Sequence, residues 1–119
     1  MNLPNGRRWD VAAANASLPG LTALVGSVRA AVTRARAREA ADLPGGTDIR
    51  IVIYGVTAKL AVDGIVLRDL EKGLLDFPAR TPDGRDYWLC WVVGEPAVEW
   101  WHWPDTGFAG RRPLTDPPT

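Results

Sequence analysis

The chain has 119 residues, 46% of them hydrophobic and 24% charged, which is typical of one soluble globular domain and not of a disordered or fibrous protein. Fourteen basic side chains balance fourteen acidic ones, so no net charge attracts nucleic acid or an anionic membrane, and we expect neither as a partner. The single cysteine, Cys90, excludes an intramolecular disulfide and the cysteine-rich zinc motifs, and we expect a cytoplasmic protein without a membrane span.

The N-terminal half predicts a helical hairpin over residues 9–63. Asp10 is a candidate N-cap, and Pro19 followed by Gly20 predicts a kink or a break before a longer helix that runs to about Ala41. Apolar residues recur along it at spacings of three and four: Leu18, Leu21, Val25, Val28, Val32 and Ala35. Residues 48–63 predict a second helix with an apolar face made of Ile49, Ile53, Val56 and Leu60. The β-branched run 49–54 leaves a strand as the alternative there.

Residues 64–104 predict an antiparallel β-meander of three to four strands. Short runs of β-forming residues, 65–69, 74–79, 87–93 and 98–103, are separated by turn sequences. Residues 105–119 form a tail rich in glycine, arginine and proline, and we expect its last part, residues 113–119, to be a frayed end. The predicted fold class is therefore α+β, with an N-terminal antiparallel helical hairpin packed on a small antiparallel sheet, in a single domain of residues 1–119.

The register of the hairpins decides which side chains share a face of this sheet. Counting outward from four-residue turns gives three closing pairs: Asp69 with Leu74, Arg80 with Arg85, and Val93 with Val98. This register places Asp76 and His102 on one face, their backbones roughly 10 Å apart, and turns Cys90 toward the other face. Trp91 and Trp100 share the face with Asp76, and we expect the two helices to cover the opposite one.

Four side chains are candidates for chemistry. His102 has the ordinary pKa nearest neutrality, so it is a candidate base, proton relay or metal ligand, or else a structural residue among tryptophans. Asp76 stands in an apolar strand and needs partners such as His102 or Arg68. Glu95 and His102 are weak metal candidates because no third ligand is evident. Arg111 follows a glycine-rich stretch, which suggests a small-anion site.

Three stretches carry a resemblance to a known family: GIVLRDLEKGLLDFPA at 64–79, DYWLCWVVGEP at 86–96 and WWHWPDTGFAGRRP at 100–113. They resemble the bacterial domain of unknown function 2203. The resemblance implies a helical hairpin with a small sheet and a cytosolic bacterial setting, and it implies no reaction, so the cofactor stays open. The positions matching the family's recurrent polar residues are Asp69, Asp76, Glu95, His102, Gly107, Gly110 and Arg111.

The sequence as a whole favours a non-catalytic binding module. We expect it to self-associate, or to bind a protein partner or small anionic ligand, through an aromatic face, because large exposed aromatic faces are seldom left bare. The candidate binding residues are Asp76, Trp91, Trp100, His102 and, at the edge, Arg111. The alternative is a small metal-dependent or acid–base enzyme, which requires His102, Asp76 and Glu95 to converge.

Overall fold

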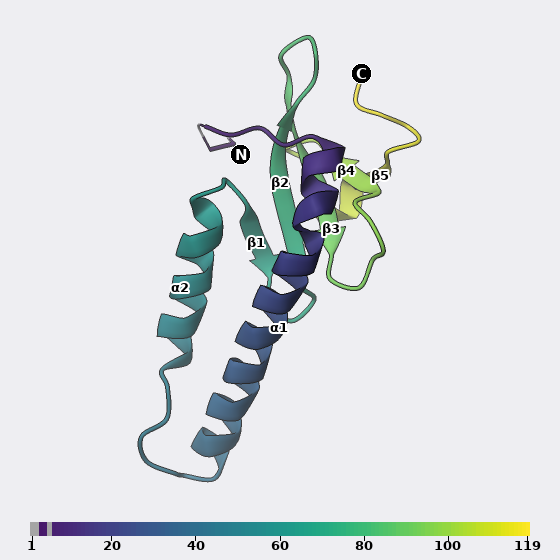
Figure 1. Cartoon of the computed structure of the whole chain (residues 1–119). Helices are drawn as coiled ribbons and strands as arrows, with labels where there is room; N and C mark the ends of the chain where they lie inside the picture. The colour runs from purple at the N-terminus through teal and green to yellow at the C-terminus, as the bar shows by residue number, and fades with distance from the viewer. Residues whose placement is uncertain (1–2, 5) are drawn as a thin grey trace.

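The fold is α+β, as predicted, and comprises two helices followed by a five-stranded antiparallel sheet (Figure 1). The computed structural model describes residues 3–4 and 6–119. The elements are α1 (Val11–Ala40), α2 (Ile49–Ala61), β1 (Val66–Asp69), β2 (Leu74–Arg80), β3 (Asp86–Val92), β4 (Trp100–His102), the 3-10 turn η1 (Phe108–Gly110) and β5 (Arg112–Pro113). The strands lie in the sheet in chain order, β1 to β5.

The helix α1 begins where the sequence predicts, because the Asp10 side chain accepts a hydrogen bond from the backbone N–H of Ala13 at 2.7 Å. The predicted apolar stripe is confirmed: Leu18, Leu21, Val25, Val28, Val32 and Ala35 are all buried. Of the two outcomes expected at Pro19, a kink or a break, the break is wrong, since α1 continues through this residue. Pro19 is exposed, and burial of Leu18 and Leu21 on either side, about 1.5–3 kcal/mol each, offsets a loss of about 3 kcal/mol at an interior proline.

The second segment, α2, is a helix and not a strand, capped by the Asp48 side chain, which accepts from the backbone N–H of Arg50 at 2.9 Å. Val56 and Leu60 are buried against α1, as predicted. The two helices are unequal, with 30 and 13 residues, so the pair is a long helix with a short partner. In Figure 1 the first half of α1 lies over the sheet and its second half runs beside α2, which gives a molecule measuring 55 × 27 × 25 Å.

The predicted sheet register is wrong by one residue in two of its three hairpins. Arg80 pairs with Asp86, not with Arg85, because Thr81 to Gly84 forms a tight turn and Thr81 also bonds Arg85. Gly84 has a φ of +90° and adds one residue to the loop. In the next hairpin Cys90 pairs with Trp100, again one residue away from the expected register. Only the pairing of Asp69 with Leu74 is confirmed.

A one-residue slip exchanges the faces of a strand, so the two predicted faces are mixed. The face under α1 carries Leu75, Phe77, Ala79, Tyr87, Leu89, Trp91 and Trp101, and these residues form one core with the α1 stripe. The opposite face carries Leu74, Asp76, Pro78, Trp88, Cys90, Trp100 and His102. Trp91, expected on an open face beside Asp76, is therefore a core residue on the other side of the sheet.

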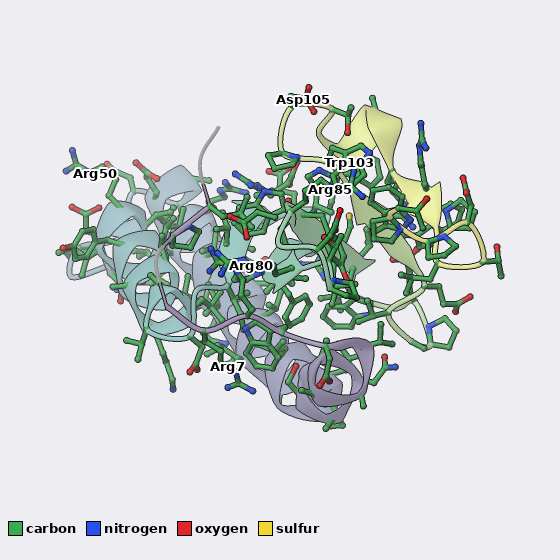
Figure 2. The ribbon with its side chains drawn as sticks, turned by 90° about the horizontal axis from the view of Figure 1, so that it is seen from above. Arg7, Arg50, Arg80, Arg85, Trp103 and Asp105 are labelled. Atoms are coloured by element: carbon green, nitrogen blue, oxygen red, sulfur yellow. The ribbon has the colours of Figure 1, made fainter. Side chains whose placement is uncertain are left out.

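The β2–β3 loop carries an exposed group of charges at one end of the molecule. Arg85 lies beside Trp103 in the view of Figure 2, and its guanidinium is 4.9 Å from the Trp103 ring centroid. Asp86, where β3 begins, accepts from the Nε–H groups of Arg80 at 2.9 Å and of Arg8 at 3.2 Å. Asp86 therefore joins the N-terminal segment to this hairpin.

The expected frayed end at 113–119 is wrong for residues 113–116. The tail before it forms η1, and Pro113 belongs to the short fifth strand β5, which pairs with β4. Beyond β5, the backbone N–H of Leu114 donates to the carbonyl of Glu99 at 2.8 Å, and the Trp101 indole N–H donates to the carbonyl of Asp116 at 2.8 Å.

Helix α1 also bears on the expectation that the chain has no membrane span. By length and composition alone α1 is long and apolar enough to cross a membrane, whereas the sequence was expected to contain no stretch of that length and hydrophobicity. Core helices of soluble proteins pass the same test.

Candidate functional site

The candidate site is built around Asp76, which points from the middle of β2 to the sheet face away from α1. Its Oδ2 accepts from the Nε–H of Arg68 and lies near Nε2 of His102, at 2.9 Å in each case. Asp76 and His102 are both buried, each 2% exposed. Asp76 and His102, which the sequence placed two strands apart on one face, are therefore in direct contact, and Arg68 is the further partner that a buried carboxylate requires.

Arg68 reaches Asp76 from the edge strand β1. The pairing of β1 with β2 shifts between Leu67 and Asp69, so Arg68 lies at a β-bulge. Its guanidinium lies 4.9 Å from the ring centroid of Trp88, which is buried on β3. The bulge thus presents a cation to both a carboxylate and an aromatic ring.

The His102 ring is held at both nitrogens. Nδ1 lies 2.8 Å from the backbone carbonyl of Trp103, and Nε2 lies 2.9 Å from Asp76. A carbonyl and a carboxylate only accept, so both contacts are hydrogen bonds when the ring carries a proton on each nitrogen, which is the imidazolium form. Burial opposes that charge, but the hydrogen bond to Asp76 and its negative charge outweigh burial and raise the pKa of His102 above its ordinary value.

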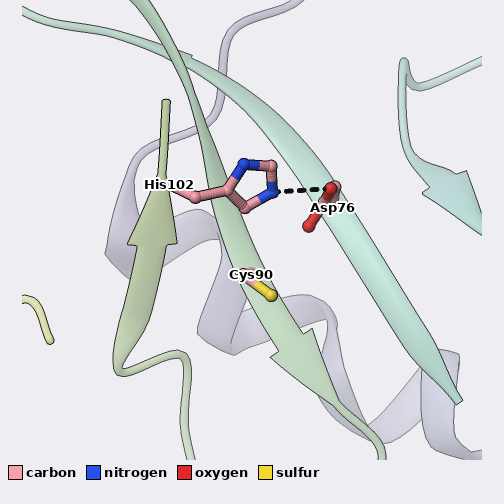
Figure 3. Close-up of side chains that lie close together, drawn as sticks. All are labelled: Asp76, Cys90 and His102. Carbon is pink, nitrogen blue, oxygen red and sulfur yellow. Dashed lines mark hydrogen bonds and ion pairs between the residues drawn. The ribbon is translucent and has the colours of Figure 1, made fainter. Parts of the chain in front are cut away.

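Cys90 completes the group, contrary to the predicted register, which had turned it away from His102. It pairs with Asp76 across β2 and β3, and its side chain lies beside Asp76 and His102 (Figure 3). Burial raises the pKa of the Cys90 thiol to about 12, and the charge of Asp76 adds to that effect. The thiol is therefore not an activated nucleophile, and neither ring nitrogen of His102 is free to take its proton.

Two small pockets open on either side of Arg68. One has a volume of about 200 Å³ and is lined by Leu74, Asp76, His102, Gly107 and Phe108 together with Arg68. The other has about 250 Å³ and is mainly apolar, and its lining includes Trp88, Val66, Ile65 and Arg68. Among the buried side-chain atoms that the structure describes, Asp76 Oδ1 and Trp88 Nε1 have no hydrogen-bond partner. One accepts and the other donates, and each belongs to a residue that lines one of the pockets.

Arg111 and Glu95 are occupied with each other rather than with Asp76. The Arg111 guanidinium donates to Glu95 Oε2, while Oε1 of Glu95 accepts from the backbone N–H of Val92 at 2.8 Å. Arg111 also stacks on Trp100 and Phe108, with 4.4 and 4.9 Å to their centroids. These contacts support the Phe108 wall of the smaller pocket, and they leave Glu95 outside the hydrogen bonds that join Asp76 to His102.

The structure thus divides the sequence candidates into three groups. Asp76 and His102 are in contact, Trp100 and Arg111 support the edge of the site, and Trp91 lies in the core, where its indole donates to the Glu95 carbonyl at 3.0 Å. Sequence analysis missed Cys90 and Trp88. Counting one more residue in the turn that contains Gly84 would have found both, because this register places Cys90 and Trp88 on the same face of the sheet as Asp76.

Comparisons with known proteins give one match. The search of curated proteins and the search of solved structures found none. The sequence model of the family described as "Uncharacterized conserved protein (DUF2203)" matches residues 7–114, a range that includes every element from α1 to β5 and all the site residues described above. The chain therefore belongs to the DUF2203 family.

Proposed function

We propose that this protein is a non-catalytic binding module for a small anionic ligand that also carries a hydroxyl group. The observation that carries the proposal is the pair of buried, unpartnered polar atoms flanking Arg68, the acceptor Asp76 Oδ1 and the donor Trp88 Nε1. A buried polar atom without a partner costs about 1–3 kcal/mol, so a ligand that satisfies both recovers that loss on binding.

The charges around the pockets favour an anion. Arg68 lines both pockets, and His102 lines the smaller one with both ring nitrogens donating. Two cations therefore stand against the single carboxylate of Asp76. An oxyanion suits the Arg68 guanidinium and the Trp88 indole N–H, and a hydroxyl donor suits Asp76 Oδ1. Hydroxycarboxylates and hydrogen phosphate combine these two features.

The geometry supports binding over acid–base catalysis. The enzyme alternative requires His102, Asp76 and Glu95 to converge, and both Glu95 oxygens are engaged by Arg111 and the backbone of Val92. A base must also have a nitrogen free to accept the substrate's proton, whereas both His102 nitrogens face protein acceptors.

Binding is tested by NMR titration of chelator-treated protein with inorganic phosphate and, separately, with a small hydroxycarboxylate. We expect a saturable shift of the Trp88 indole N–H resonance, identified with a Trp88→Phe variant. Arg68→Gln should weaken binding at least about tenfold, because it removes the cation between the pockets. Arg36→Gln is the matched control, since Arg36 is an exposed arginine that pairs with Glu71 away from the pockets.

Two results would overturn the proposal. One is a Trp88 resonance that does not saturate with either probe. The other is equal affinity of the Arg68→Gln and Arg36→Gln variants, which would indicate binding by general charge attraction. Arg68→Lys keeps the charge and guards against misfolding of the glutamine variant, so it should bind more tightly than Arg68→Gln.

Self-association stays a prediction, but the surface that would mediate it is different. The residues of the aromatic face expected from the sequence are divided between the core under α1 and the candidate site on the other face of the sheet. The large apolar side chains that are most exposed among the described residues lie on α2 and at its C-terminal cap: Ile51, Tyr54 and Val62 are 68%, 77% and 84% exposed. Sedimentation equilibrium at several protein concentrations tests it, and a monomer mass independent of concentration would contradict it.

A further inference from the structure

The group Asp76, Cys90 and His102 contains a carboxylate, a thiol and an imidazole, which are the three ligand types that zinc takes in proteins. Each offers one ligand atom, and these atoms all lie within 4.8 Å of one another. In a tetrahedral zinc site with bonds of about 2.0–2.3 Å, ligand atoms stand roughly 3.3–3.6 Å apart. The present spacing therefore exceeds that of a bound site by about 1.5 Å at most.

Two details of the hydrogen bonding prepare these residues for a metal ion. The Nδ1 of His102 is fixed on the Trp103 carbonyl, the arrangement usual for histidines that bind metal through Nε2. Asp76 holds Arg68 and His102 with Oδ2 alone, so Oδ1 has a lone pair with no protein partner. In Figure 3 this second oxygen lies on the side of Asp76 that faces Cys90.

We infer that Asp76 Oδ1, Cys90 Sγ and His102 Nε2 form a binding site for a zinc-class divalent cation. The ion displaces two protons to solvent, one from the thiol and one from Nε2, whose hydrogen bond to Asp76 it replaces. Arg68 keeps its hydrogen bond to Oδ2 and holds the carboxylate in place. The two charges of the ion replace the two protons, so the net charge of the site is unchanged.

A fourth coordination position is available at the small pocket. Three protein ligands leave one position of a tetrahedral ion open. The pocket of about 200 Å³ is lined by both Asp76 and His102, and Gly107 and Phe108 form another part of its wall. The inference goes beyond the proposed anion site and does not rest on it, because it is argued from the spacing of the three ligand atoms, although both sites use Asp76 Oδ1. The pocket is large enough for water or a small anion at the fourth position.

Cobalt substitution tests the site directly, because thiolate-bound Co²⁺ has a charge-transfer absorption in the near ultraviolet and tetrahedral Co²⁺ absorbs strongly in the visible. We expect metal-free protein titrated with Co²⁺ alone to show both bands, saturating at one ion per chain, and Zn²⁺ to abolish them. Cys90→Ser should remove the charge-transfer band. Glu95→Gln is the matched control, because its carboxylate is bonded to Arg111 and not to this group.

The wild-type titration decides the question even if a variant fails to fold. No charge-transfer band at saturating Co²⁺, or an undiminished band in Cys90→Ser, would overturn the inference. Loss of both bands in Glu95→Gln, with native circular dichroism, would also overturn it by moving the site to Glu95. The two proposals fail separately, since phosphate binding is measured in chelator-treated protein through Arg68 and cobalt binding through Cys90.

Discussion

At the scale of single residues, two glycines in the sheet turns adopt the left-handed backbone for different reasons. Gly73, between β1 and β2, has a φ of +70°, and a Cβ there would lie 2.8 Å from the Val93 side chain. Gly84, in the β2–β3 loop, has a φ of +90° and open space around it. Of these two glycines, Gly73 therefore combines backbone strain with a packing limit, and Gly84 has the backbone strain alone.

This difference predicts unequal costs for the same substitution. Gly84→Ala should lower the free energy of unfolding by about 1–2 kcal/mol, the cost of the left-handed conformation for an L-residue. Gly73→Ala should lower it by about 1–3 kcal/mol more, because the new methyl group overlaps Val93. Urea unfolding of the two variants measures both values, and equal losses would contradict the close approach.

The site residues show the limits of sequence analysis at this scale. The carboxylate at Asp76 and its need for His102 or Arg68 followed from polarity in an apolar strand. The contribution of Cys90 did not, because it depends on the one extra residue that Gly84 allows in a turn. Side chains alternate between the two faces of a strand, so an error of one residue in the register places every side chain of that strand on the wrong face.

At the scale of elements, the β2–β3 hairpin is tied to the N-terminal segment through Asp86. Hydrogen bonds from Arg80 and Arg8 lower the pKa of Asp86 below its ordinary value. A lowered pKa stabilises the fold above the ordinary value of about 3.9, and this contribution is lost as pH falls through the lowered value.

Asp86→Asn should therefore lower the free energy of unfolding by about 1 kcal/mol near neutral pH, a modest value because Asp86 is partly exposed to solvent. The difference from wild type should shrink below about pH 4 and vanish at lower pH. Asp105→Asn, at an exposed carboxylate, is the control and should show little change at any pH. An Asp86→Asn deficit that stays constant with pH would contradict the pairing.

The helices were predictable because their signals are local, and the apolar stripe of α1 appears in the sequence at the spacing it has in the structure. The continuity of α1 through Pro19 could not be predicted from local signals. It depends on the sheet beneath that turn, where the buried stripe from Ala14 to Val25 joins the core of β2, β3 and β4. Tertiary burial there outweighs what the local sequence favours.

At the scale of the whole molecule, the C-terminal segment is part of the fold. Beyond β5 it supplies the carbonyl of Asp116 to the buried Trp101 indole and pairs Leu114 with Glu99. Proline content alone indicated a loose end. The hydrogen bonds that hold this segment are made with residues far away in the sequence, so the composition of the segment does not reveal them.

Deleting residues 114–119 should therefore lower the free energy of unfolding by about 1–3 kcal/mol, because it leaves the Trp101 N–H buried without an acceptor. Deleting residues 118–119 alone removes neither contact and should have little effect. Thermal and urea unfolding of both truncations compare them. Equal stability of the longer truncation and the full chain would show that the segment contributes nothing to the fold.

The unbroken course of α1 has a mechanical consequence. At about 1.5 Å per residue its 30 residues extend about 45 Å, most of the 55 Å length of the molecule. The same rod is fastened to the sheet over its first half and to α2 over its second half. We therefore expect the two ends of the molecule to move together, because both are packed against the same continuous helix. A response to an event beside Asp76 is then expected to be a local change around the site and not a swing of the helices.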